Sequence, residues 1–388
     1  MRKKNEFALM RVTLRALLRR RIAFALLAAV AAGGAFSAII LHNLIVRQET
    51  ALRDTMENAT ISCTVTNARG TDSGNLQMLS AFVEMLVGKR RERGCALDDY
   101  VKNVRAKAEL PLEAPEGFRL RRILSVDSDP ALSQAEGAAV QFFDGWDEGA
   151  LRGQEQLCLV PPALLTADGR ITVCEDMQAP VSLQIAGVVT NGPANVIYCP
   201  YFMPWVEGSS VAFLTDCCSF DIRDNRRLAE SKAYLYEWFV FPEISNQSDG
   251  LTFGVLVDDE AFQNNIAEIR ETLSMLRILQ PLLILLCGCI GFFASFLATR
   301  GRTKEFAVMR CIGIGRWRVF GLVMAELILP SAIGVCLGSA GGSFLEGGLQ
   351  AGGLRSAALM TGVFLLGAAV AAIRITGVNT MKLMKSED

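Results

Sequence analysis

Histidine is nearly absent from this sequence: the 388 residues include one, His42. A Ser-His-Asp triad, a Cys-His pair and an HExxH zinc site all require histidine beside the other catalytic groups, so none of them can be assembled here. The sequence also lacks the GxxxxGKS or GxxxxGKT pattern of a phosphate-binding loop. We therefore predict no catalytic residue, no metal site and no cofactor on this chain.

Charged residues are scarce as well. Only 20% of the residues are charged, compared with about 25% in an average soluble protein, and 51% are hydrophobic. The formal net charge is -1, so the bulk electrostatics indicate no nucleic-acid partner. The apolar residues gather in long uncharged runs, and such runs are typical of a membrane protein.

Four apolar runs are long enough to cross a bilayer. The first covers residues 22–46 and contains no Asp, Glu, Lys or Arg. It exceeds the roughly 7 to 15 residues of a signal-peptide core, so we interpret it as a retained anchor. The other predicted transmembrane helices cover residues 278–299, 319–345 and 356–373. Runs of this length match about 30 Å of hydrocarbon.

Basic residues determine the predicted orientation. Residues 1–21 carry eight Lys or Arg against the single acid Glu6, and the loop 300–318 carries six against Glu305. The positive-inside rule places these segments and the tail 374–388 in the cytoplasm, and residues 47–277 and 346–355 on the opposite side. We predict a multi-pass protein of the cytoplasmic or inner membrane, in contact with membrane lipid, with both termini in the cytoplasm.

The large segment 47–277 predicts an inserted α/β (α+β) extracytoplasmic domain. Short β-like stretches, separated by Gly, Pro and Asp turns, alternate with helical patterns such as residues 76–87. The predicted strands cover residues 119–126, 157–160, 183–189, 196–198 and 251–257.

Seven of the eleven cysteines lie in the same segment, at Cys63, Cys95, Cys158, Cys174, Cys199, Cys217 and Cys218. The number is odd and no CxxC pair occurs, so disulfides and free buried thiols both stay open. The adjacent Cys217 and Cys218 have no second cluster that would complete four metal ligands, so we interpret them as structural.

The passage from this domain into the second apolar run predicts one continuous helix. Asp258, Asp259 and Glu260 favour a helix N-terminus, and no Gly or Pro follows until Pro281. Apolar residues then recur at spacings of four, three, four and three, as in a coiled coil. They are Phe262, Ile266, Ile269, Leu273 and Leu276.

We predict that this seam forms a stalk with an outward extension of the first apolar run. That extension is amphipathic, with Leu41, Ile45, Leu52 and Met56 along one side. The alternative is that each helix packs only on the core of the extracytoplasmic domain.

Small residues recur at every fourth position in the third apolar run, at Gly334, Gly338 and Gly342. Such faces let helix backbones approach closely, so we predict helix contacts there, within one chain or across a dimer. Glu326 is the one carboxylate within a predicted transmembrane helix. Because a charge in lipid is costly, we favour a helix contact or a snorkelling position for Glu326 over a proton relay.

The basic loop carries a distinctive motif. From Thr303 to Arg316 it reads Thr-Lys-Glu-Phe-Ala-Val-Met-Arg-Cys-Ile-Gly-Ile-Gly-Arg. This order resembles the cytoplasmic loop of the FtsX-like permease family, which includes MacB-type and LolC/LolE-type ABC transporter subunits. The family also has one transmembrane helix, an outer domain and then three transmembrane helices. Residues 155–160, 185–189 and 196–204 resemble the closing half of a MacB-type periplasmic core domain.

The resemblance implies a permease subunit that is not itself an enzyme. In this family the loop forms a coupling helix on a separate cytoplasmic ABC ATPase, which binds ATP and Mg²⁺, and the stalk relays ATP-driven movement to the outer domain. A second permease copy or a paralogue, and an extracytoplasmic substrate or partner protein, are implied as well. The residues that match the coupling motif are Lys304, Glu305, Phe306, Ala307, Val308, Met309, Arg310, Ile312, Gly313 and Arg316.

Four apolar members of the motif, Phe306, Val308, Met309 and Ile312, lie among cations. We expect them to be the anchors that enter a groove of the ATPase, with the cations as a charged rim.

Two features depart from the family pattern: Asn379-Thr380 replaces the usual Asn-Pro, and no ATPase is fused to the chain. They leave the subfamily open, and with it export, lipoprotein or peptide extrusion, and mechanotransmission. One alternative is a signalling subunit that activates a cell-wall hydrolase without transport. Another is a membrane-anchored receptor or adhesin without an ATPase, for which the loop 300–318 would be dispensable.

Overall fold

The computed structural model describes residues 21–90, 96–110, 117–133, 139–173, 180–204, 213–240, 253–345 and 351–376. The chain divides into two compact units. One, the helical unit, comprises Met1–Arg53 and Asn265–Asp388, and the other, the α/β unit, comprises Asp54–Asn264. The predicted N-terminal segment 1–20, part of the loop 346–355 and the tail beyond residue 376 lie outside the described residues, as do Cys95 and Cys174.

Four helices of the helical unit are long and apolar enough to cross a membrane. They are α2 (Arg21–Asn58), α7 (Glu260–Arg300), α9 (Arg316–Leu345) and α10 (Ala351–Thr376). Each contains one of the predicted apolar runs, so the prediction of a four-helix membrane protein is confirmed. As predicted, α7 begins at Glu260 and continues through Pro281 without a break. Its beginning and the end of α2 belong to the α/β unit.

Glycine allows α9 to lie directly against α2. A Cβ atom at Gly334 or Gly338 would overlap the backbone oxygen of Ala28 or Ala32, and one at Gly342 would press on Ile39. The predicted glycine face is therefore a contact within one chain, and its alternative, a contact across a dimer, is not needed to explain it. A glycine contact also joins α10 to α7, because Gly367 faces the backbone of α7.

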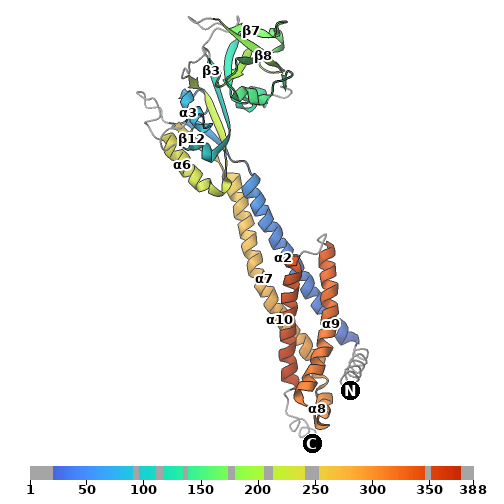
Figure 1. The fold of residues 1–388 in the computed structure, drawn as a ribbon. Helices are drawn as coiled ribbons and strands as arrows, with labels where there is room; N and C mark the ends of the chain where they lie inside the picture. The colour runs from blue at the N-terminus through green and yellow to red at the C-terminus, as the bar shows by residue number, and fades with distance from the viewer. Residues whose placement is uncertain are drawn as a thin grey trace. The chain divides into compact units, whose positions relative to one another are not determined.

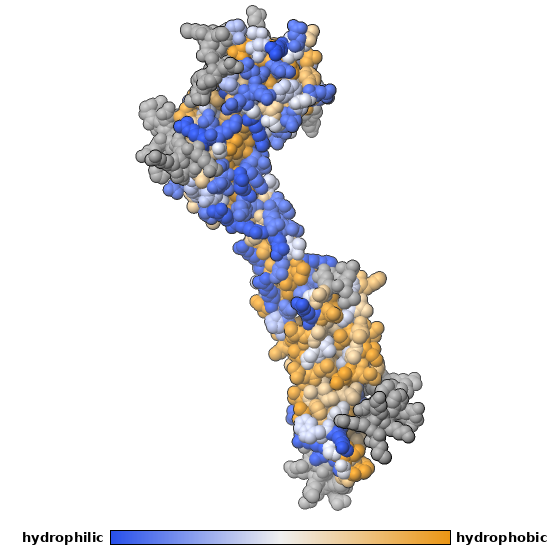
Figure 2. All heavy atoms as spheres, in the orientation of Figure 1, coloured by the Kyte–Doolittle hydropathy of each residue, from blue (hydrophilic) through white to orange (hydrophobic). Residues whose placement is uncertain are grey.

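The interior of the helical bundle is packed with apolar side chains, and further apolar side chains point outward. Ala31, Val323, Phe364 and Ala368 belong to the buried cluster. Leu282, Leu285, Phe293, Leu337 and Leu366 are exposed on the outer surface. Figure 2 shows the hydrophobic surface of these helices on the face in view. In water such a surface would be unfavourable, and in a bilayer it meets lipid.

The α/β unit is built on a sheet of ten strands (Figure 1). The order along the sheet is β12 (Phe253–Asp258), β1 (Ser62–Asn67), β11 (Cys217–Ile222), β3 (Val101–Leu110), β4 (Arg119–Ile123), β9 (Val196–Pro200), β6 (Leu157–Val160), β8 (Val181–Thr190) and β5 (Ala139–Phe142). The tenth strand, β7 (Arg170–Val173), pairs with β8. Neighbours are antiparallel except for β4 with β9 and β6 with β8. A separate pair joins β2 (Met78–Leu79) to β10 (Leu214–Thr215).

Three apolar clusters stabilise this unit. One lies at β1, β3 and β11 and includes α3 (Ser80–Leu86) and α6 (Leu228–Val240). The other two lie on opposite faces of β6, because Cys158 and Val160 belong to one cluster and Leu157 and Leu159 to the other. Short helices connect the strands: α4 (Leu97–Tyr100), α5 (Pro130–Ser133), η1 (Val126–Ser128), η2 (Glu148–Arg152), η3 (Pro162–Leu164) and η4 (Asn225–Arg227).

The predicted α/β class is confirmed, and the elements differ in detail. Strand β6 has the predicted bounds, and β4, β8, β9 and β12 overlap their predictions. The predicted helix 76–87 is wrong at its beginning, because Met78 and Leu79 pair with Thr215 and Leu214. Strand β3 was not expected, since its Lys, Arg, Ala and Glu residues favour helices in isolation. The alternation of apolar and charged residues over positions 104–110 is the sequence signal that could have identified it, and burial alternates in the same way.

Candidate functional site

The predicted coupling motif forms a short helix, α8 (Thr303–Cys311), between α7 and α9. Its end is made by Gly313, which has a φ of 98° and donates its N–H to the carbonyl of Arg310 at 3.1 Å. The N–H of Ile314 also closes back on Met309, at 3.1 Å. Only glycine adopts this left-handed conformation at low cost, so the Ile-Gly of the motif has a structural reason as the end of α8.

One side of α8 faces the other helices of the helical unit. Phe306 is 2% exposed and belongs to the buried cluster that contains Val319 and Ile375. Met309 is half-buried against the same cluster. The expectation that Phe306 is an exposed anchor for a partner is wrong, because its ring attaches α8 to α9 and α10 instead.

A buried charge cluster attaches the same helix at its beginning. Arg302 is buried, donates to Oε2 of Glu305 at 2.7 Å and forms an ion pair with Glu326 of α9. Its guanidinium also lies 5.1 Å from the centre of the Phe306 ring. Burial lowers the pKa of Arg302, but the hydrogen bond that Arg302 donates to Glu305 and the charge of Glu326 outweigh it, so the pKa is raised.

Glu326 therefore makes a helix contact, as one of the sequence interpretations expected. Arg302, its partner, was not among the predicted site residues. An arginine placed directly after a transmembrane run, together with a lone carboxylate in the next run, is the signal that could have found the pair.

The other side of α8 is open and apolar. Val308 is 58% exposed, Ile312 at the end of the helix 76%, and Trp317 at the beginning of α9 74%. Val308 and Ile312 are four residues apart and share a face. Arg316 and Arg318 are exposed beside them, and Arg310 donates to the carbonyl of Thr376 at 3.4 Å. Trp317 was not predicted, although a tryptophan within a basic loop is an uncommon choice for a solvent-facing position.

The remaining members of the motif differ in how far their side chains are exposed. Ala307 is half-buried, Glu305 is exposed, and Lys304 lies in the backbone of α8 while its side chain is outside the described residues. Gly313 is the only described residue of the motif that requires a glycine conformation.

The residues of the predicted stalk seam are divided between the helical unit and the α/β unit. In the helical unit, Leu273 is buried with Leu41 and Ile45 of α2. Leu52, Ile269 and Leu276 pack against the same cluster, and Arg277 pairs with Glu49 at 2.8 Å. In the α/β unit, Phe262 packs on the sheet core, as the alternative expected. Ile266, which belongs to the helical unit, is buried as well. Met56 does not belong to the seam cluster.

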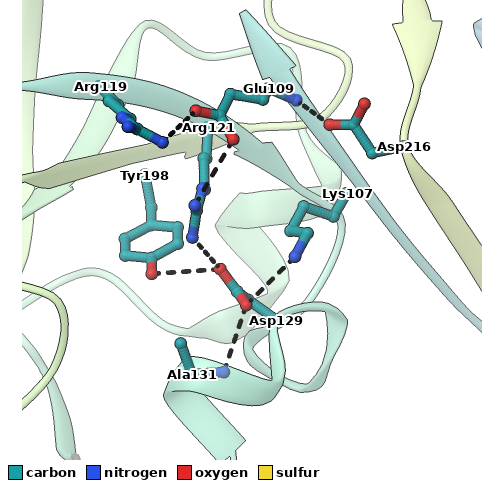
Figure 3. Close-up of polar contacts among 8 residues, drawn as sticks. All are labelled: Lys107, Glu109, Arg119, Arg121, Asp129, Ala131, Tyr198 and Asp216. Carbon is teal, nitrogen blue, oxygen red and sulfur yellow. Dashed lines mark hydrogen bonds and ion pairs between the residues drawn. The ribbon is translucent and has the colours of Figure 1, made fainter. Parts of the chain in front are cut away.

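A polar network lies inside the α/β unit, and sequence reasoning missed it (Figure 3). Asp129 is 2% exposed and accepts hydrogen bonds from Arg121 at 3.0 Å, the Tyr198 hydroxyl at 3.2 Å and the N–H of Ala131 at 3.2 Å. Lys107 lies 3.4 Å from Oδ1 of Asp129, the oxygen that also accepts from Ala131. Burial raises the pKa of Asp129, but these donors outweigh it and hold the pKa below its ordinary value.

The described cysteines of the α/β unit are free thiols: Cys63, Cys158, Cys199, Cys217 and Cys218. Burial raises the pKa of Cys63 and of Cys199 to about 12. Such thiols are protonated at neutral pH and weakly reactive. No group of three or more His, Cys, Asp or Glu side chains that could hold a metal lies within the ranges that the structure describes.

Comparisons with known proteins agree with the motif. Residues 281–380 match the family of FtsX-like permease C-terminal domains. No curated protein matches the chain in sequence. Two solved structures are similar to about half of the chain. The periplasmic region of MacB from Actinobacillus actinomycetemcomitans is 14% identical, with a TM-score of 0.31 over 54% of this chain and 94% of that one. The extracellular domain of the ABC-type transporter YknZ from Gram-positive bacteria is 12% identical, with a TM-score of 0.32 over 50% of this chain and 99% of that one.

Proposed function

From its C-terminal domain this chain is a member of the FtsX-like permease family, and we propose that it is a membrane subunit whose α8 docks on a separate cytoplasmic ABC ATPase. The ATPase would bind ATP and Mg²⁺, and this chain would contribute no catalytic residue. The positive-inside distribution of charge supports a cytoplasmic location for α8 and both termini.

The exposed apolar face of α8 is the observation that carries this proposal. Val308, Ile312 and Trp317 present apolar side chains to solvent beside Arg316 and Arg318. An apolar centre with a charged rim is the ordinary composition of a docking helix. The anchors differ from those expected from sequence, because Phe306 faces inward.

The opposite side of α8 supports a mechanical role. Phe306 and Arg302 join the helix to α9 and α10 through a buried ring and a buried ion pair. A displacement of α8 by an ATPase would therefore act on the membrane helices instead of being absorbed by a loose loop.

We propose further that α7 passes this movement to the α/β unit on the extracytoplasmic side. The helix is 41 residues long, which corresponds to about 60 Å, and its beginning belongs to the α/β unit. The subunit would act with a second copy or a paralogous permease and would expel or reshape an extracytoplasmic substrate or partner.

Affinity purification from native membranes tests the docking surface. Wild type is compared with Val308→Asp combined with Ile312→Asp, and with Leu256→Asp as a matched control at an exposed apolar position of the α/β unit. We expect an ABC ATPase to co-purify with wild type and with the control, and to be lost from the double variant. Retention by the double variant would place the docking surface elsewhere, and absence of an ATPase from folded wild type would overturn the proposal.

A further inference from the structure

A pocket of about 780 Å³ lies within the α/β unit. The loop before β2, the end of β3 and the connection from β10 to β11 line it. This volume is in the range of sites that hold small organic molecules or a few residues of a peptide. No residue of the pocket takes part in the proposed docking of an ATPase.

The walls of the pocket are held by backbone hydrogen bonds. The N–H of Leu76 donates to the carbonyl of Asp216 at 2.8 Å, and the N–H of Asp216 donates to the carbonyl of Lys107 at 2.9 Å. In the loop before β2, Asn75 and Gln77 have φ values of 51° and 53°. Left-handed backbone at a residue such as glutamine is uncommon and persists where surrounding contacts determine it. The pocket is therefore formed before any ligand arrives.

Ion pairs neutralise two of the three charged residues in the wall. Arg119 and Arg121 lie 3.3 and 3.5 Å from the carboxylate of Glu109, and Lys107 lies 3.4 Å from Asp129 (Figure 3).

The third charged residue of the wall, Asp216, is not neutralised by an ion pair of this kind among the described residues. Its Oδ2 accepts the N–H of Glu109 at 2.5 Å, and no cation of the described residues lies within ion-pairing distance of it. Burial raises the pKa of Asp216 above its ordinary value, and the N–H of Glu109 and the more distant charges of Lys107 and Arg121 only partly oppose that rise.

Apolar side chains stand beside this carboxylate. Leu110 and Phe213 are half-buried at the pocket, and Leu214 is exposed although β10 pairs with β2. An anionic group next to a leucine and a phenylalanine suits a molecule with a cationic end and an apolar body.

We propose that the pocket binds an amphipathic organic cation, with its ammonium or guanidinium group paired to Asp216 and its apolar part against Phe213 and Leu214. The cation is supplied either by a free organic amine or by an Arg or Lys side chain of a peptide. The site does not depend on the proposed ATPase, because ligand binding requires only the folded α/β unit.

Calorimetric titration of the full-length protein in nanodiscs of zwitterionic lipid tests the site, with empty nanodiscs subtracted. One arm uses 4-phenylbutylamine and its neutral analogue 4-phenylbutanol. The second arm uses the blocked peptide acetyl-Leu-Arg-Leu-amide and its Gln-containing analogue. We expect the cation of at least one arm to bind about tenfold more tightly than its neutral analogue. The arm in which the cation is preferred identifies whether a free organic amine or a peptide side chain supplies the cation.

Three variants make the result specific. Asp216→Asn keeps an acceptor for the N–H of Glu109 and is expected to lose the tenfold preference, whereas Asp168→Asn, at an exposed turn, keeps it. Leu214→Arg places a cation of the chain itself beside Asp216 and is expected to block the probe. Equal affinity of cation and neutral analogue for wild type would overturn the proposal, and so would an unchanged preference in folded Asp216→Asn. No ATPase is present, so failure of docking on α8 would not alter either outcome.

Discussion

The Nζ of Lys232 in α6 donates hydrogen bonds to both carboxylate oxygens of Asp259, at 3.1 and 3.0 Å. Asp259 directly precedes α7, and its carboxylate also accepts from Gln263 in the first turn of that helix. The ion pair therefore attaches the beginning of α7 to the α/β unit. Any movement that passes along α7 into this unit reaches it at this contact.

Lys232→Met should loosen that attachment. The variant leaves a buried carboxylate without its cation, and we expect the unit to lose about 1–3 kcal/mol of stability. Hydrogen exchange should rise in β12 and in the first turn of α7. Lys102→Met, at a lysine for which no ion pair is found among the described residues, is the control and should change exchange little. Equal protection in both variants would contradict the role given to Lys232.

Asp129→Asn should change how the α/β unit responds to acid. The folded pKa of Asp129 lies below its ordinary value, so its stabilisation is complete above the unfolded pKa of about 3.9 and is lost as the pH falls through the folded pKa. At neutral pH the variant should lose on the order of 3 kcal/mol, because Lys107 loses its ion-pair partner and Arg121 keeps only Glu109. Below pH 4 wild type and variant should converge.

Denaturant unfolding followed by hydrogen exchange in β4 and β9 measures both effects. Asp127→Asn, two residues away and exposed, is the matched control and should behave as wild type at each pH. A constant gap between wild type and Asp129→Asn from pH 7 to 3 would show that the pKa of Asp129 is the same in the folded and unfolded states.

Gly338→Ala should destabilise the helical unit, because the added methyl group would overlap the backbone oxygen of Ala32. The two helices must separate, at a cost on the order of 1–3 kcal/mol. Gly321→Ala on the same helix has open space around its Cβ and should be neutral or slightly stabilising. Thermal unfolding in detergent compares the two. Equal melting temperatures would mean that α2 and α9 do not pack through Gly338.

Glu326→Gln should release α8 from the bundle. Arg302 then keeps Glu305, whose side chain is exposed, but loses the carboxylate buried beside it. We expect a loss of about 1–3 kcal/mol locally, seen as faster hydrogen exchange in α8. Glu305→Gln removes only the exposed pair and should cost less than about 1 kcal/mol. The reverse order of the two effects would show that the exposed pair is the one that holds Arg302.

Sequence reasoning located α8 but mistook its faces. The motif predicted a helix with apolar anchors, and Val308 and Ile312 are exposed as expected. Phe306 has the same apolar character yet is buried, because α9 and α10 cover that side of the helix. A short helix does not contain the information about which side its neighbours will occupy. The Asp129 network and the pocket at Asp216 were missed for the same reason, since each depends on residues distant in the sequence. Arg302 and Trp317 had a local signal that was not used.

The membrane character of the chain, its four long helices and the position of its basic loop could be read along the sequence, because hydrophobic length and local charge act over consecutive residues. The partner of each helix face, the register of β3 in the sheet and the neutralisation of each buried charge were decided only in the folded protein. Those features arise from contacts between residues such as Lys232 and Asp259 or Arg302 and Glu326, whose energies depend on burial that local sequence does not specify.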